Sequence, residues 1–142
     1  MIFSAIKWAF RLAFPLLLAL VTYETVTPDP GEPAGASLAN WIAVALFNDD
    51  AFADKVGHFM AYASLSGALT LAQYASLRTS AIGVAALALY GAALEGVQGL
   101  SPNRYTDLWD GAANAAGGVC AYLIGAALVL AMRRVALRSE ED

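Results

Sequence analysis

The feature that most constrains the fold is a succession of apolar stretches of about 20 residues, the length of helix that crosses a bilayer. Hydrophobic residues make up 59% of the 142-residue chain and charged residues only 14%, a balance far from that of a soluble domain. In lipid, every backbone N–H and C=O must be bonded within the protein, so only helices and closed barrels span it. The sequence therefore predicts an all-α, polytopic membrane protein that forms one domain over residues 1–142.

Four transmembrane helices are predicted, at residues 6–26, 54–77, 80–100 and 108–132, packed as a four-helix bundle. A cleaved signal peptide is the alternative reading of the first stretch. The outer loop, residues 27–53, opens with a proline-rich run that cannot continue a helix. Ser37 then offers an N-cap to an apolar segment that ends near Phe47. That segment is too short to span, so we expect an interfacial or re-entrant helix.

Charged residues are distributed unevenly between the two sides of these helices. Basic residues precede the first span and follow the last, whereas most acidic residues fall in the loops on the other side. Because cations favour the cytoplasmic side, we expect a multi-pass protein of the bacterial inner membrane with both termini in the cytoplasm. Membrane lipids are then its immediate partners. The net charge of −4 argues against a nucleic-acid partner.

Polar residues gather where the second span begins, the third ends and the fourth begins. Antiparallel packing brings these three helix ends to one membrane face, the outer one. Ionisable groups inside a membrane are costly, so they indicate a partner, a water-filled cavity or a functional site. The residues concerned are Asp54, Lys55, His58 and Tyr62, then Glu95 and Gln98, then Arg104, Asp107, Asp110 and Asn114.

Three of these residues are candidates for catalysis: His58, Asp54 and Glu95. Asp54 lies one turn before His58 and can accept a proton from one ring nitrogen, which leaves the other nitrogen as a base or ligand. Glu95 is the candidate acid or proton carrier. A structural histidine held by a carboxylate is the alternative interpretation.

The remaining polar residues are candidates for ligand binding. Arg104 either forms an ion pair with Glu95 that fixes the loop between the third and fourth spans, or binds an anionic ligand. One of the two aspartates caps the fourth span, and the Asn114 amide is expected to hydrogen-bond across to the second or third span. The full set of binding candidates is Arg104, Gln98, Asp107, Asp110, Asn114, Lys55 and Tyr62.

No metal ligand and no cofactor are predicted, because no spacing in this set is diagnostic of a metal site. A divalent cation held by Asp107, Asp110, Glu95 and His58 is the alternative left open. Small residues also recur every fourth position along the fourth span, from Ala113 through Gly117 to Gly125. Such a ladder is typical of a seam where helices pack closely in lipid.

Three motifs follow one another through residues 54–125: Asp54-Lys55-x-x-His58-Phe59-x-x-Tyr62, then Glu95-x-x-Gln98, then Arg104 followed by Asp107, Asp110 and Asn114-x-x-Gly117. In order and position they resemble the VanZ-like family of small bacterial membrane proteins, named for a member linked to teicoplanin resistance. The resemblance implies a role in the cell envelope, such as binding or acting on an envelope lipid or wall precursor in the manner of glycopeptide resistance. The alternative is a non-catalytic accessory subunit of a larger membrane complex or a homo-oligomer.

Overall fold

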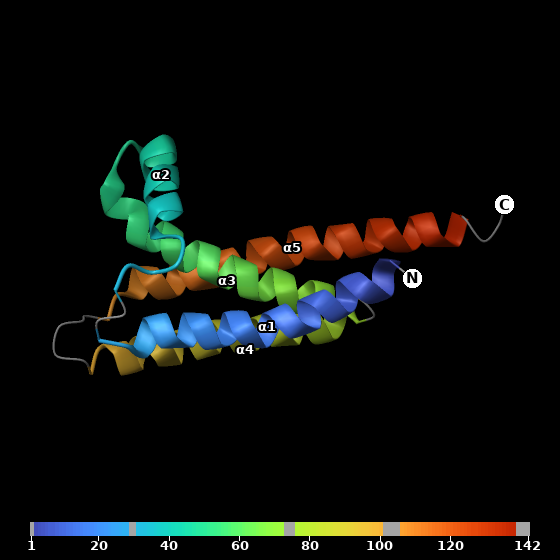
Figure 1. Ribbon diagram of the computed structural model, residues 1–142, viewed down its shortest axis with the longest axis horizontal. Helices are drawn as coiled ribbons and strands as arrows, with labels where there is room; N and C mark the ends of the chain where they lie inside the picture. The colour runs from blue at the N-terminus through green and yellow to red at the C-terminus, as the bar shows by residue number, and fades with distance from the viewer. Residues whose placement is uncertain (1, 29–30, 73–75, 101–105, 139–142) are drawn as a thin grey trace.

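The computed structural model describes residues 2–28, 31–72, 76–100 and 106–138, and the described chain is helical throughout its regular elements. Four long helices lie side by side, and the shorter α2 stands away from them (Figure 1). The predicted all-α bundle is confirmed. In chain order the elements are α1 (Ile2–Val26), α2 (Ala36–Phe47), the 3₁₀ turn η1 (Asp50–Phe52), α3 (Ala53–Ala72), α4 (Leu77–Gln98) and α5 (Leu108–Arg138).

Three helical segments are long and apolar enough to cross a membrane: Ser4–Val26, Leu77–Gln98 and Leu108–Val135. This composition makes the chain a membrane protein. Helix α3 is not among the three, although a span was predicted there. It contacts all the other α-helices of the described chain and buries polar residues such as Ser66 and Thr70. A helix that faces protein instead of lipid does not need apolar residues on every side. This accounts for the lower hydropathy of α3 compared with α1, α4 and α5.

The helix ends differ from the predicted limits by a few residues. Helix α3 ends at Ala72 and α4 begins at Leu77, instead of the predicted boundaries at 77 and 80. Ser76 caps α4 by accepting a hydrogen bond from the Thr79 N–H at 3.3 Å. Helix α5 continues past the predicted end at 132 to Arg138, because the basic residues after the apolar stretch are good helix formers.

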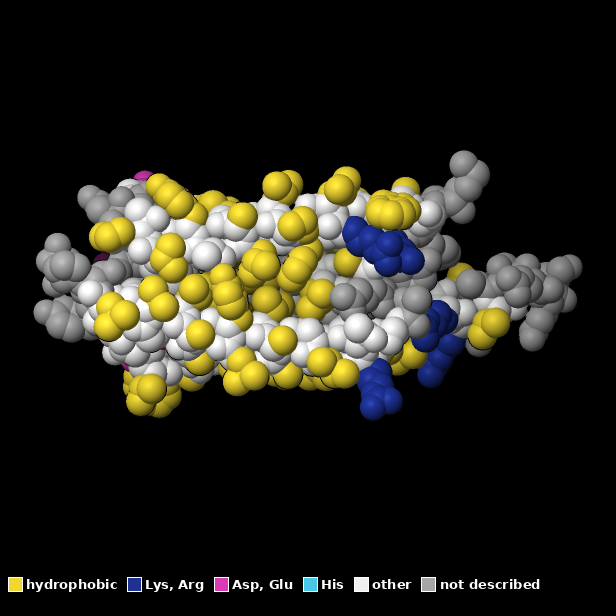
Figure 2. Space-filling view, turned by 90° about the horizontal axis from the view of Figure 1, so that it is seen from below, with side chains coloured by type: hydrophobic (Ala, Val, Ile, Leu, Met, Phe, Trp, Pro, Cys, Tyr) yellow, Lys and Arg dark blue, Asp and Glu magenta, His cyan; other side chains and the backbone are white. Residues whose placement is uncertain are grey.

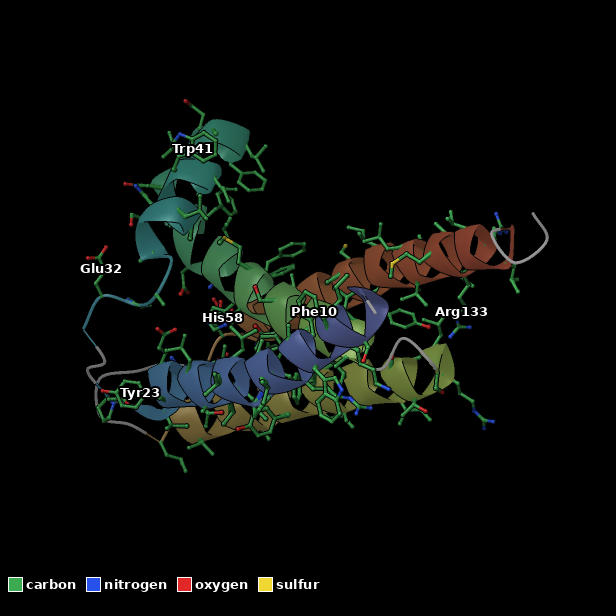
Figure 3. All side chains as sticks on the ribbon, turned by 45° about the vertical axis from the view of Figure 1, so that its right-hand side comes forward. Phe10, Tyr23, Glu32, Trp41, His58 and Arg133 are labelled. Atoms are coloured by element: carbon green, nitrogen blue, oxygen red, sulfur yellow. The ribbon has the colours of Figure 1, made fainter. Side chains whose placement is uncertain are left out.

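The short apolar helix is present, but its predicted N-cap is wrong. Helix α2 begins at Ala36 after Gly35, whose φ of 84° only glycine adopts readily, and no side chain caps it. Ser37 therefore lies inside the first turn. One face of α2 packs Ala39 and Ala43 against Val56 of α3, while Trp41 lies on the part of α2 that is remote from the bundle (Figure 3).

Helices α3 and α5 approach so closely that their backbones touch. A Cβ atom added at Gly117 would overlap the Phe59 carbonyl oxygen, and one added at Gly125 would lie 3.0 Å from the Thr70 methyl group. The predicted small-residue seam on the last helix is therefore confirmed. This contact fixes the spacing between the two helices that carry most of the polar candidates.

The two ends of the bundle differ in charge. Both chain termini lie toward the same end (Figure 1). Figure 2 shows Lys and Arg side chains near that end and apolar side chains over the middle of the visible face. The polar residues of the candidate site lie toward the opposite end, where His58 is seen between the helices (Figure 3).

Candidate functional site

Lys55, in the first turn of α3, lies at the centre of a group of aspartates. Its Nζ atom is 2.5 Å from Asp110 Oδ1, 2.6 Å from Asp107 Oδ2 and 3.2 Å from Asp54 Oδ2. Asp54 belongs to the same helix, whereas Asp107 immediately precedes α5 and Asp110 lies in its first turn. Lys55 therefore ties the N-terminal ends of α3 and α5 together, and it stabilises the buried carboxylate of Asp110, whose side chain is only 6% exposed.

His58 lies one turn deeper and faces a different partner on each side of its ring. Its Nδ1 atom is 3.2 Å from Asn114 Oδ1 and 3.7 Å from Glu95 Oε1. Its Nε2 atom is 3.7 Å from Asp54 Oδ1 and 3.7 Å from Asp110 Oδ2. Only the Asn114 contact is short enough to be a hydrogen bond. With Nδ1–H donating to Asn114, the Nε2 lone pair points between the two aspartates.

Asp54 and Asp110 each divide their two oxygens between Lys55 and His58. Oδ2 of Asp54 and Oδ1 of Asp110 face the ammonium group, and the remaining oxygen of each faces Nε2 of His58. Two carboxylates thus connect the two basic side chains. The predicted Asp54–His58 pair is present at 3.7 Å, but the hydrogen bond that orients the ring is the one that Nδ1–H donates to Asn114 Oδ1.

Glu95 and Gln98 extend the site along α4. The Glu95 side chain is 5% exposed, and neither of its oxygens has a hydrogen-bond partner among the described residues. The Gln98 Oε1 atom is likewise buried without a hydrogen-bond partner in the described chain. A buried carboxylate in this condition is costly to maintain. Its nearest described basic group is the His58 ring.

Asp107, just before α5, has two roles. Its Oδ1 atom accepts a hydrogen bond from the Trp109 N–H at 2.9 Å, so this aspartate is the predicted cap of the helix. Its Oδ2 atom accepts one from Lys55. These two donors, the lysine first, hold the pKa of the Asp107 carboxyl below its ordinary value.

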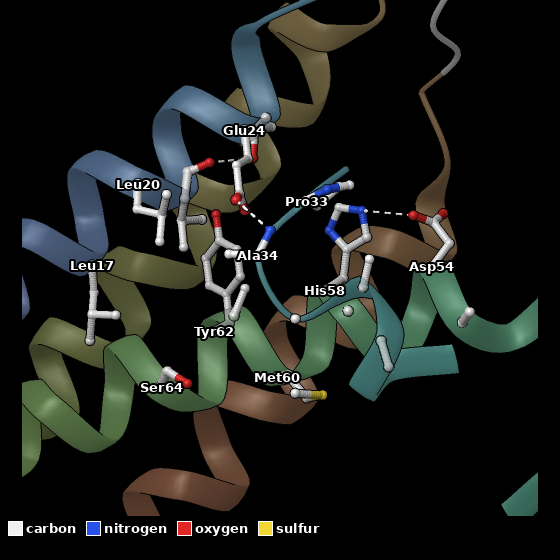
Figure 4. Close-up of a pocket in the computed structure, with 18 of the residues that line it drawn as sticks. Leu17, Leu20, Glu24, Pro33, Ala34, Asp54, His58, Met60, Tyr62 and Ser64 are labelled. Atoms are coloured by element: carbon white, nitrogen blue, oxygen red, sulfur yellow. Dashed lines mark hydrogen bonds and ion pairs between the residues drawn. The ribbon is translucent and has the colours of Figure 1, made fainter. Parts of the chain in front are cut away.

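A cavity of about 560 Å³ opens beside His58, between α1, α3 and the start of α2. Asp54, His58, Gln98 and Glu24 supply its polar wall, and side chains of α1 and α3 supply an apolar wall (Figure 4). The apolar residues include Leu17, Leu20, Val21, Met60 and Ala61. The cavity therefore has a polar part at the cluster and an apolar part along the bundle.

The structure brings nearly all the predicted site residues together. Asp54, Lys55, His58, Glu95, Asp107, Asp110 and Asn114 form one cluster, and Gln98 and Tyr62 line the adjoining cavity. The predicted roles of Arg104, as a partner of Glu95 or as an anion-binding group, lie outside the described residues.

Glu24 was missed by the sequence reasoning. It lines the cavity and its Oε1 atom accepts a hydrogen bond from the Ala34 N–H at 2.7 Å, which fixes the chain between α1 and α2. The signal was available, since Glu24 follows Leu17, Leu20 and Val21 on one face of the first helix. A charged residue that continues an apolar face marks the polar end of a cavity.

Comparisons with protein-family models, with curated proteins and with solved structures gave no match. The chemistry of the cluster and its cavity therefore carries the functional argument. An imidazole whose tautomer is set by an amide, with acidic neighbours and an adjoining cavity, can bind a cation, transfer a proton or hold a polar headgroup.

Proposed function

We propose that this protein is a VanZ-like membrane protein that binds an amphiphilic component of the bacterial cell envelope, a lipid or a lipid-linked wall precursor. The supporting observation is the shape of the cavity beside His58. Its polar wall and its apolar wall lie within one volume of about 560 Å³, which is within the range of small-molecule sites. An amphiphile places its headgroup at the cluster and its acyl chain along α1 and α3.

The charges that line the cavity favour a headgroup that donates hydrogen bonds. Asp54 and Glu24 are acceptors when ionised, and His58 is the basic residue of the described lining. Hydroxyl groups of a glycerol or sugar, or the amine of an ethanolamine, satisfy such acceptors. A headgroup bearing only phosphate oxygens meets repulsion at the same positions.

His58 is the candidate acid–base residue of this site. It lines the cavity, and Asn114 holds its Nδ1 atom, so Nε2 is available to take a proton from a bound hydroxyl or amine. Asp54 and Asp110 then stabilise the imidazolium that forms, because both carboxylates face Nε2. Glu95 is the candidate proton carrier on the other side of the ring.

We further propose that the cluster lies at the outer face of the bacterial inner membrane, with both termini in the cytoplasm. The positive-inside rule supports this orientation, because Lys7, Arg11, Arg133 and Arg134 belong to the terminal ends of α1 and α5. The site then faces the compartment in which envelope precursors are used.

The accessory-subunit alternative would draw on α2, which exposes Leu38, Trp41 and Phe47. Contact with lipid accounts for such a surface in a membrane protein without any partner chain. The cavity has no equivalent explanation, so we retain the binding function.

Native mass spectrometry of the protein extracted from its own membranes in mild detergent tests this proposal. We expect one amphiphile per chain in the unmodified protein and in the control Ala127→Trp, which adds an indole on the exposed surface of α5. The Ala61→Trp variant places the same group in the cavity wall and should lose the amphiphile. Retention of the ligand by a folded Ala61→Trp protein would exclude this cavity, and a partner protein at fixed ratio would favour the accessory role.

A further inference from the structure

The oxygens that face Nε2 of His58 belong to a site with more negative than positive charge. Four carboxyl groups, those of Asp54, Glu95, Asp107 and Asp110, surround a single ammonium group and one imidazole. Lys55 already contacts three of the four. The positions around Nε2 therefore lie in a region where a second cation is stabilised.

The spacing of the atoms around Nε2 is compatible with a set of metal ligands. Both aspartate oxygens are 3.7 Å from Nε2, beyond hydrogen-bonding distance. One atom each from Asp54, His58 and Asp110 lie within 4.8 Å of one another. Ligand atoms around a tetrahedral metal with bonds of about 2.0–2.2 Å are roughly 3.3–3.6 Å apart. The two distances to Nε2 are therefore nearly short enough, and ligand atoms of this set that are as much as 4.8 Å apart have to approach by up to roughly 1.5 Å. The Asp54 side chain can move toward the other two ligand atoms, because it is 66% exposed.

The orientation of the ring agrees with this arrangement. A histidine ligand usually donates its other ring N–H to an oxygen, which fixes the tautomer and directs the lone pair at the metal. Asn114 Oδ1 provides that acceptor at Nδ1. The lone pair of Nε2 then points at two carboxylate oxygens, an unfavourable contact that a cation placed between the three atoms makes favourable.

Glu95 adds to the negative charge around His58, although it does not face the proposed ligand atoms. Its side chain is 5% exposed, its oxygens lack hydrogen-bond partners among the described residues, and Oε1 is turned toward His58 from α4 at 3.7 Å. Buried carboxylates are ordinarily paired or bind metals. Glu95 thus adds negative charge on the side of the ring opposite to Asp54 and Asp110.

We propose that Asp54 Oδ1, His58 Nε2 and Asp110 Oδ2 bind one divalent transition-metal ion at the mouth of the cavity. One imidazole with two carboxylate oxygens suits Zn²⁺, Mn²⁺ or Fe²⁺, whereas Mg²⁺ and Ca²⁺ prefer oxygen ligands alone. Lys55 does not have to leave, because it uses the other oxygen of each aspartate. The ion enters past the exposed Asp54. Because the ion takes up the Nε2 lone pair, the acid–base role proposed above for His58 applies only to the metal-free protein. Metal binding itself does not depend on which amphiphile the cavity accepts.

Calorimetric titration of the untagged, detergent-solubilised chain with Zn²⁺ tests the site. We expect the unmodified protein to bind one ion per chain. The affinity for Zn²⁺ should be about 10- to 100-fold lower in Asp54→Asn, which removes one ligand. This residue is exposed, so its substitution does not endanger folding. Asp107→Asn is the matched control, because it removes the same charge beside Lys55 but no oxygen that faces His58. Its affinity should fall by about threefold at most, as expected for a screened charge at a distance.

The histidine ligand has a direct spectroscopic test, because His58 is the only histidine of the chain. Pulsed electron paramagnetic resonance of the Mn²⁺-loaded protein should show coupling to an imidazole nitrogen, which has to come from His58. Equal losses in the two aspartate variants, absence of nitrogen coupling, or no saturable Zn²⁺ binding below 1 mM would each overturn the proposal.

Discussion

The backbone contact between α3 and α5 leads to a sharp stability prediction at Gly117. A Cβ atom at this position would overlap the Phe59 carbonyl oxygen and lie 2.9 Å from the carbonyl carbon and 3.0 Å from Cα of Phe59. Carbon atoms are ordinarily separated by about 3.5–4.0 Å, so the two helices must move apart by roughly 0.5–1 Å to accept Gly117→Ala. Backbone atoms cannot rotate out of the way as a side chain can.

The expected cost follows from this overlap. Overpacking of this kind destabilises by about 1–3 kcal/mol, even though alanine is the better helix former. The matched control is Gly111→Ala in the same helix, where an added Cβ has nothing within 4 Å. That change should be neutral or stabilise by up to about 1 kcal/mol, because alanine loses less backbone entropy than glycine. The unfolding free energies of the two variants should therefore differ by about 1–4 kcal/mol.

Equilibrium unfolding in mixed detergent micelles, followed by circular dichroism, measures the difference. Gly117→Ala should also weaken Zn²⁺ binding, because Gly117 and Phe59 adjoin the Asn114–His58 hydrogen bond that orients the ring. A Gly117→Ala protein as stable as Gly111→Ala would refute the close backbone contact, and with it the spacing on which the cluster depends.

Three further predictions concern other contacts. Lys55→Gln should destabilise the bundle by about 1.5–3 kcal/mol in the same assay, because it leaves Asp110 buried without its cation, and adding Asp110→Asn should recover part of the loss. The folded-state pKa of Asp107 is lowered, so its contribution to stability is complete above its unfolded pKa and is lost as pH falls through the folded value. The unfolding free energies of the unmodified and Asp107→Asn proteins should therefore differ at neutral pH and converge once the pH falls below the lowered pKa. Gly91→Ala should cost about 1–3 kcal/mol, because the new Cβ would lie 2.7 Å from the hydroxyl oxygen and 2.8 Å from Cζ of Tyr62. Tyr62→Leu, which removes both atoms, should relieve part of this cost in a double-variant cycle.

The convergence of the polar residues was predictable because it depends on topology alone. Alternating helices place the start of α3, the end of α4 and the start of α5 at one end of any up-and-down bundle. The four-residue steps from Asp54 to His58 and Tyr62 then select the face of α3. No side-chain detail was needed to expect that Glu95 and Asp110 would meet His58.

The pairing within the cluster was not predictable, because it depends on distances of less than a helical turn. Sequence spacing favours Asp54 as the partner of His58, since both lie on one helix. The close approach of α3 and α5 brings Asn114 nearer to the ring, at 3.2 Å against 3.7 Å for Asp54. The two residues face different ring nitrogens, and a difference of half an ångström decides which contact is a hydrogen bond. Sequence spacing cannot predict such a difference.

The lower hydropathy of α3 and the seam on α5 are two aspects of one arrangement. Because α3 is packed against the other helices, it buries Ser66 and Thr70 completely and Lys55 and His58 in part. This packing in turn requires that α5 come close, and glycine is the residue that allows it at Gly117. A polar site in a bundle of this size therefore needs small residues on the facing helix within a turn of the polar ones. On α5, Gly117 follows Asn114 by one turn, and His58 of α3 lies opposite. The small-residue seam therefore positions the site and also holds the bundle together.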